Sequence, residues 1–144
     1  MENSTVTSKS SKLKLDFKES KYATGRRKTS IAKVWLKKGS GKIYVNGKIY
    51  SDYFANDNHK MQITRPFEII NQPTEYDVRC SVKGGGPTGQ AGAMVHGISK
   101  ALVLFDENFK ISLKTEKLTT RDSRAVERKK PGRRKARRSF QFSK

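Results

Sequence analysis

Cysteine and histidine are scarce in this chain of 144 residues, which has one cysteine, Cys80, and two histidines, His59 and His96. A single cysteine excludes an internal disulfide framework and a multi-cysteine zinc site. Two isolated histidines form no metal cluster and support no histidine-based catalytic pair. We therefore predict no metal site and no catalysis by a histidine pair. Cys80 lies in an alternating apolar pattern and is expected in the core.

Acidic residues are also few, because 13 Asp and Glu stand against 32 Lys and Arg. The resulting formal charge of +19 and sequence pI near 10.3 indicate a polyanionic partner, with nucleic acid ahead of an anionic membrane. Apolar runs long enough to cross a bilayer are missing, and so is a basic amphipathic helix with a broad apolar face. The composition predicts a soluble protein with no membrane partner.

The modest apolar content, 33%, leaves room for one domain with flexible ends. Residues 1–21 are rich in Ser and Lys, and their acids and missing apolar run do not fit a transit peptide or a secretion signal. We therefore expect a disordered N-terminal extension at 1–21, a globular α/β RNA-binding domain at 22–118 and an extended basic C-terminal tail at 119–144.

Residues 119–144 contain eleven Lys and Arg and two acids, so this tail carries 11 − 2 = +9 of the net charge. Such a run repels itself and stays extended until a dense negative charge neutralises it. Arginine predominates, and its planar guanidinium binds phosphate with two parallel hydrogen bonds. The pattern favours a polyanion-binding tail over a solubilising, nuclear-localisation or membrane-surface segment.

The pattern of apolar residues indicates a mixed α/β domain. We expect a strand over 22–38 that forms a hairpin with 42–45, then short helices at 51–54, capped by Ser51, and 64–70, with Pro66 in the first turn. Residues 76–83 alternate as a strand with Asp77 on the solvent face. A helix over 90–105 places Ala91, Val95, Ile98, Leu102 and Phe105 against this sheet.

A glycine-rich loop, Gly84–Gly89, joins the expected strand and helix and formally contains G-x-G-x-x-G. A dinucleotide site is excluded because no second parallel strand follows the helix, and a P-loop is excluded because Gln90 and Ala91 replace its Lys and Ser or Thr. Glycines before a helix N-terminus still allow close approach of a phosphate. The loop, with Lys83, is a candidate site for RNA phosphate, and a purely geometric role is the alternative.

These residues resemble the bacterial form of the small-subunit ribosomal protein family numbered nine. The similarity is carried by the glycine loop and the helix after it (84–102), and by three basic segments, 24–30, 120–130 and 135–144. The resemblance implies a non-enzymatic component of the small-subunit head that uses no cofactor or small-molecule substrate, binds small-subunit rRNA and contacts other head proteins. The weak transit-peptide signal of residues 1–21 favours a bacterial-type cytoplasmic ribosome over an organellar one. A free nucleic-acid chaperone or nucleoid-type protein is the alternative.

The resemblance also implies a fold and a set of binding residues. The fold is a two-layer domain similar to the second domain of ribosomal protein S-five, with a mixed sheet covered by helices and a left-handed βαβ crossover. The residues that it assigns to rRNA are Arg26, Arg27, Lys28, Lys83, Gly84, Gly85, Gly86, Gly89, Arg121, Arg124, Arg128, Lys129, Lys130, Arg133, Arg134, Lys135, Arg137 and Arg138. The residues that it assigns to the peptidyl-site tRNA are Phe142, Ser143 and Lys144.

Overall fold

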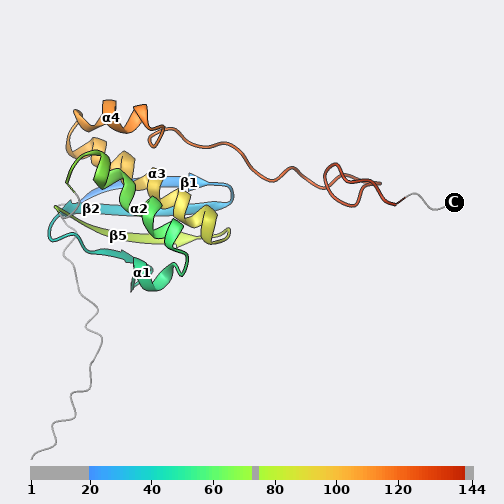
Figure 1. Cartoon of the computed structure of the whole chain (residues 1–144), viewed down its shortest axis with the longest axis horizontal. Coiled ribbons are helices and arrows are strands. Elements are labelled where there is room, and N and C mark those ends of the chain that lie inside the picture. Colours follow the sequence, from blue (N-terminus) through green and yellow to red (C-terminus); the bar gives the residue numbers. More distant parts are fainter. Residues whose placement is uncertain (1–19, 73–74, 142–144) are drawn as a thin grey trace, which may run out of the picture.

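A mixed sheet covered by helices forms the body of the protein in the computed structural model, which describes residues 20–72 and 75–141 (Figure 1). The five strands are β1 (Lys21–Arg27), β2 (Ser30–Lys38), β3 (Ile43–Val45), β4 (Lys48–Ile49) and β5 (Tyr76–Lys83), and their order in the sheet is β1-β2-β5-β3-β4. The four helices are α1 (Tyr50–Tyr53), α2 (Asp57–Ile69), α3 (Pro87–Phe105) and α4 (Phe109–Thr115). The mixed α and β class is confirmed.

The expected hairpin between 22–38 and 42–45 is wrong. The segment 22–38 is itself a hairpin of β1 and β2 that closes at Arg27 and Ser30, while β3 pairs in parallel with β5 and antiparallel with β4. The turn was hidden because it contains no glycine: Lys28 takes the left-handed conformation, with φ 53°. A non-glycine residue there costs energy that the long pairing of β1 with β2 offsets.

Asp77 is buried, although the strand alternation predicted it on the solvent face. Its Oδ1 accepts hydrogen bonds from the backbone N–H groups of Ser40, Gly41 and Lys42, each at 3.0 Å. The carboxylate therefore fixes the loop that leads from β2 to β3 and supplies partners for three backbone donors that the turn leaves unpaired. Alternation alone does not reveal this, because the partners of Asp77 lie about 36 residues earlier in the chain.

Two helices differ from their expected bounds. Ser51 does not cap α1, whose N-cap is Ile49 without a side-chain hydrogen bond. The helix expected at 64–70 is the second half of α2, which begins after Asn56, where the Asn56 side chain accepts a hydrogen bond from the Asn58 N–H. Pro66 therefore lies near the end of the helix, where its buried ring packs in the core and its missing N–H interrupts only the last turns.

The α3 helix covers the sheet and contacts β1 and β2 most closely (Figure 1). It begins at Pro87 rather than near Gln90, as proline suits the first helical position. Ala91, Ile98 and Leu102 are buried as expected, whereas the expected Val95 and Phe105 are only partly buried. Val95 lines a pocket between α2 and α3, and Phe105 is the last residue of the helix.

A pair of glycines brings α3 against the sheet. A Cβ added to Gly25 on β1 would stand 1.9 Å from the Ala93 carbonyl oxygen and 2.3 Å from the Gly97 nitrogen. A Cβ added to Gly97 would stand 2.7 Å from a methyl group of Val34. The lack of a side chain at Gly97 thus allows α3 to lie close to the sheet.

Cys80 is a core residue, as predicted, with 2% of its surface exposed. Burial raises the pKa of its thiol to about 12, so the reactive thiolate form is disfavoured at neutral pH. The rest of the core lies between the sheet and the helices. It includes Val34, Leu36 and Val78 from the strands and Ile98 from α3, each with no exposed surface.

Candidate nucleic-acid interface

The β1–β2 turn and the glycine loop lie side by side at one end of the sheet. Ile31, just after the turn, pairs with Lys83, just before the loop. A Cβ added to Gly84 would lie 2.8 Å from the backbone oxygen of Thr29, which shows how closely the two segments approach. The structure thus brings Lys28 and Lys83, both exposed, to the same end as the loop. We call this region, residues 27–30 and 83–89, the loop end.

The first two glycines of the loop have a structural role. Gly84 and Gly85 adopt the left-handed region, with φ 80° and 63°. The Gly84 carbonyl oxygen accepts hydrogen bonds from Ser30 Oγ at 3.0 Å and from Gln90 Nε2 at 3.1 Å. A Cβ on Gly85 would come within 2.1 Å of Ser30 Oγ. These contacts hold the loop against β2 whether or not a ligand binds.

Gly86 and Gly89 differ from each other in their surroundings. Gly86 is the N-cap of α3, has ordinary extended backbone with φ −104°, and has no atom within 4 Å of an added Cβ. Gly89 is buried against Ser30, so it faces the protein and not the solvent. Of the loop glycines assigned to rRNA, Gly86 is thus the one whose small size the domain does not require.

The N-terminus of α3 is exposed at this end. Gly86 makes no side-chain capping bond, and Pro87 and Thr88 beside it are exposed. The first turn of a helix leaves backbone N–H groups without helical partners, and the helix dipole gives them partial positive charge. The loop end therefore combines exposed lysines, a glycine with open space above it and a helix N-terminus, which together suit a phosphate group.

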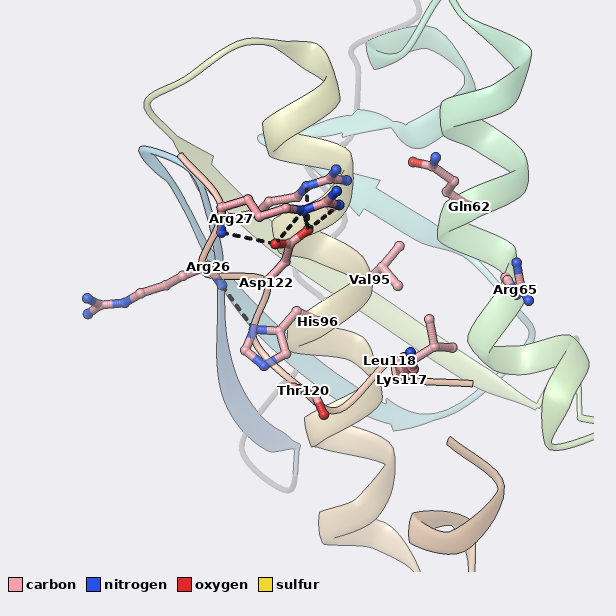
Figure 2. A pocket seen from close by; sticks show the side chains of 12 residues that line it. Arg26, Arg27, Gln62, Arg65, Val95, His96, Lys117, Leu118, Thr120 and Asp122 are labelled. Atoms are coloured by element: carbon pink, nitrogen blue, oxygen red, sulfur yellow. Dashed lines mark hydrogen bonds and ion pairs between the residues drawn. The ribbon is translucent and has the colours of Figure 1, made fainter. Parts of the chain in front are cut away.

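Arg26 and Arg27 point in different directions. The Arg26 backbone N–H donates to His96 Nδ1 at 3.2 Å, and the Arg26 side chain extends outward, away from α3 (Figure 2). Arg27 lies across α3 at Gly92, where an added Cβ would meet its Cδ at 2.2 Å. Its Nε is 3.9 Å from Oδ2 of Asp122. Sequence reasoning missed these contacts, because none of the partner residues shares a motif with the arginines.

His96 caps the outer edge of β1. Burial lowers the pKa of its imidazole, and the nearby positive charge of Lys100 lowers it further. The neutral ring matches its role as hydrogen-bond acceptor for Arg26. Lys100, one turn later on α3, donates to the Thr24 carbonyl oxygen at 3.0 Å, so two α3 side chains cover two backbone groups of the edge strand.

After α4 the chain lies against the domain as far as Asp122, and the residues that follow, up to 141, run away from it (Figure 1). Residues 119–141 contain no helix, and in that range the only strand-like pairing is the bridge between Arg133 and Ser139. The Arg133 N–H donates to the Lys130 oxygen at 3.2 Å, closing a turn through Pro131 and Gly132, whose φ is 75°. The chain therefore folds back on itself within the segment that was expected to be fully extended.

Glu127 stabilises this fold-back. Its carboxylate pairs with Lys130 and, at 2.9 Å, with Nε of Arg137. Hydrogen bonds from Lys130 and then Arg137 lower the pKa of Glu127. The tail cations assigned to rRNA are exposed and are not gathered at the loop end. Phe142, Ser143 and Lys144, assigned to tRNA, lie outside the described residues.

The part of the chain that the structure describes contains neither a metal-binding cluster nor a membrane-spanning helix. Within residues 20–72 and 75–141, no group of three or more His, Cys, Asp or Glu side chains could hold a metal ion. No helix in those ranges is both long and apolar enough to span a bilayer. The site is therefore defined by exposed cations, glycine backbone and a helix N-terminus.

These features define a small basic α/β protein whose exposed cations suit a polyanion. Residues 25–144 match the family described as Ribosomal protein S9/S16. The match covers most of the chain, and the chain therefore belongs to the ribosomal protein S9/S16 family. The protein is accordingly a component of the small ribosomal subunit that takes part in translation, and the role of the family is structural rather than enzymatic. The family resemblance predicted from the sequence is confirmed.

Proposed function

We propose that the protein binds small-subunit rRNA in the head of the subunit through two regions, the loop end and the basic tail of residues 119–144. The observation that carries this proposal is the convergence of Lys28, Lys83 and the open backbone of Gly86 at the exposed N-terminus of α3. Backbone donors and lysines at such a position favour phosphate over a base edge. Membership of a ribosomal family favours a fixed rRNA site over a free chaperone.

The same proposal divides the chain into an N-terminal extension (1–21), a globular domain (22–118) and the tail (119–144). None of the described tail residues, 119–141, belongs to the buried core, which supports the second boundary. We further propose that the domain has the fold of the second domain of ribosomal protein S-five, with a left-handed crossover. The parallel pairing of β3 with β5, joined through α1 and α2, supports this assignment.

The tail supplies ten of the fourteen cations that this proposal assigns to rRNA. Its arginines are exposed and lie on both arms of the fold-back that Glu127 stabilises. Guanidinium groups on two arms can reach phosphates on two strands or across one groove. In this account the end of the tail, Phe142 to Lys144, contacts the anticodon stem-loop of the peptidyl-site tRNA, on ribosomes of the bacterial type.

Replacement of Gly86 by Val tests the loop end. We expect Gly86→Val to reduce incorporation into small subunits in a reconstitution assay, because the branched side chain fills the space that a phosphate would occupy. The fold should tolerate it, since the added Cβ meets no atom within 4 Å and φ is −104°. Gly86→Ala is the matched control and should have a smaller effect.

Unchanged incorporation of Gly86→Val would leave the glycine loop with only its geometric role. Thermal unfolding of both variants separates this outcome from misfolding, because each should unfold within a few degrees of the unmodified protein.

Deletion of residues 142–144 tests the tRNA contact. We expect subunit assembly to be almost unchanged, because only one of the eleven tail cations is removed. Occupancy of the peptidyl site by tRNA in purified subunits should fall by roughly threefold to tenfold, the loss of one or two charge-assisted contacts. Equal tRNA affinity of deleted and complete subunits would contradict the assignment.

A further inference from the structure

An arginine-rich pocket lies between β1, α2, α3 and the first residues of the tail (Figure 2). Its volume is about 280 Å³, and its lining includes five cationic residues and a single acid, Asp122. The cations are Arg26, whose side chain extends outward, Arg65, which pairs with Glu116 at 2.7 Å, and Arg27, Lys117 and Arg124. Such an excess of positive charge around a cavity attracts an anion.

One wall of the pocket is constructed around Arg27. The Arg27 side chain packs directly on Gly92 and fills the space that a side chain there would need. A Cβ on Gly92 would be 2.2 Å from Arg27 Cδ and 2.8 Å from Nη1. Packing across α3 keeps the Arg27 side chain about three-quarters buried, with 26% exposed, at the edge of the cavity. The missing side chain of Gly92 thus leaves room for the Arg27 guanidinium, at a helical position where glycine is otherwise unfavourable.

Asp122 points into this arginine wall (Figure 2). Its carboxylate accepts a bidentate pair from Arg124, with Nη2 at 2.8 Å and Nε at 3.0 and 3.2 Å from its oxygens, and a backbone N–H at 3.0 Å. Arg27 approaches the same carboxylate at 3.9 Å. Two guanidinium groups around one oxyanion are the arrangement in which arginine binds a phosphate, and a carboxylate and a phosphodiester each carry one negative charge.

The contact between Asp122 and Arg27 also holds the start of the tail on the domain. Asp122 is one of the two acids in residues 119–144, and the other, Glu127, pairs with cations of the tail itself. Loss of the Asp122 contact would free the tail beyond Thr119, whose backbone is hydrogen-bonded to His96 on α3. An anion that replaces Asp122 therefore changes two properties at once, the occupancy of the pocket and the attachment of the tail.

We propose that this pocket is an rRNA phosphodiester site in which Asp122 occupies the position of the phosphate in the free protein. On assembly an rRNA phosphate replaces the carboxylate at Arg27, and the base of the tail, with Asp122 and Arg124, is released from the domain to follow the RNA. The inference rests on the proposed rRNA binding and adds to it Arg65 and Lys117, which the sequence did not assign.

Two variants of the full-length chain should have the same effect on trypsin cleavage of the tail but opposite effects on RNA affinity. Asp122→Asn removes the competing charge, and Gly92→Ala displaces Arg27 while leaving every charge in place. Both should speed trypsin cleavage after Arg121 and Arg124 in the absence of RNA. Asp122→Asn should raise affinity for a small-subunit rRNA transcript roughly threefold to tenfold, and Gly92→Ala should lower it by a similar factor.

Asp57→Asn controls for the general gain of one positive charge, because Asp57 is an exposed acid on α2 outside the pocket. An equal gain of RNA affinity in Asp57→Asn and Asp122→Asn would overturn the site, and so would weaker RNA binding by Asp122→Asn. Either result leaves the proposed function standing as long as the unmodified chain binds the transcript. Absence of binding by the unmodified chain would instead refute the proposed function.

Discussion

Removal of residues 119–144 should make RNA binding much less sensitive to salt. Each phosphate neutralised by a cation releases a counterion, so the logarithm of the binding constant falls linearly with the logarithm of salt concentration. The tail contains eleven cations, and contact of about half of them with phosphate predicts a slope shallower by roughly 3 to 5 after truncation. The measurement is a titration of small-subunit rRNA at several salt concentrations with both chains.

A full-length variant separates charge from chain length. Replacement of Arg128, Lys129, Lys130, Arg133 and Arg134 by Gln keeps the length of the chain and the Pro131 and Gly132 residues but removes five exposed cations. The salt dependence of its RNA binding should have a slope between those of the complete and the truncated chains. Identical slopes for the complete, truncated and substituted chains would show that the tail does not bind phosphate. Retention of the thermal unfolding transition would confirm that the domain remains folded, as expected from a core without tail residues.

Replacement of Gly25 by Ala should be among the most destabilising single substitutions in the domain. The added Cβ would stand 1.9 Å from the Ala93 oxygen and 2.3 Å from the Gly97 nitrogen, both of them backbone atoms of α3. Backbone cannot rotate aside, so α3 must move off β1 and lose packing along the sheet. We expect a loss of more than about 3 kcal/mol in the free energy of unfolding, a large share of a typical domain's stability.

Gly92→Ala is the matched control for stability. Its added Cβ has a contact as short, 2.2 Å, but with the side chain of Arg27, which can swing into solvent. Alanine also favours a helix over glycine by about 1 kcal/mol. Urea unfolding should therefore show a change of less than about 1 kcal/mol for Gly92→Ala. A comparable loss in both variants would contradict the close packing of α3 on β1.

The sequence predicted the elements whose signals are local. The alternation of residues 76–83 matches β5, and the apolar spacing after the glycine loop matches most of α3. The β1–β2 turn was missed because Lys28 adopts a positive φ without glycine or asparagine. The parallel pairing of β3 with β5 was missed because it depends on contacts between segments more than thirty residues apart.

The candidate interface was predictable in composition but not in arrangement. Charge and glycine content identified the basic tail and the loop. They did not distinguish Gly86, which faces open space, from Gly85, which packs on Ser30. The attachment of Asp122 to Arg27 joins residues 95 positions apart, and an isolated acid in a basic segment gives no signal of its partner.

Directed hydroxyl-radical cleavage in assembled small subunits tests the central claim, that the loop end faces rRNA. Cys80 is buried and its thiol is unreactive, so an iron chelate can be attached selectively at an introduced cysteine. Thr29→Cys places the chelate at the loop end without removing a cation, and Glu107→Cys places it beyond the far end of α3. We predict strong, localised rRNA cleavage from position 29, exceeding that from position 107. No cleavage from position 29 above the level of untethered chelate would contradict the account.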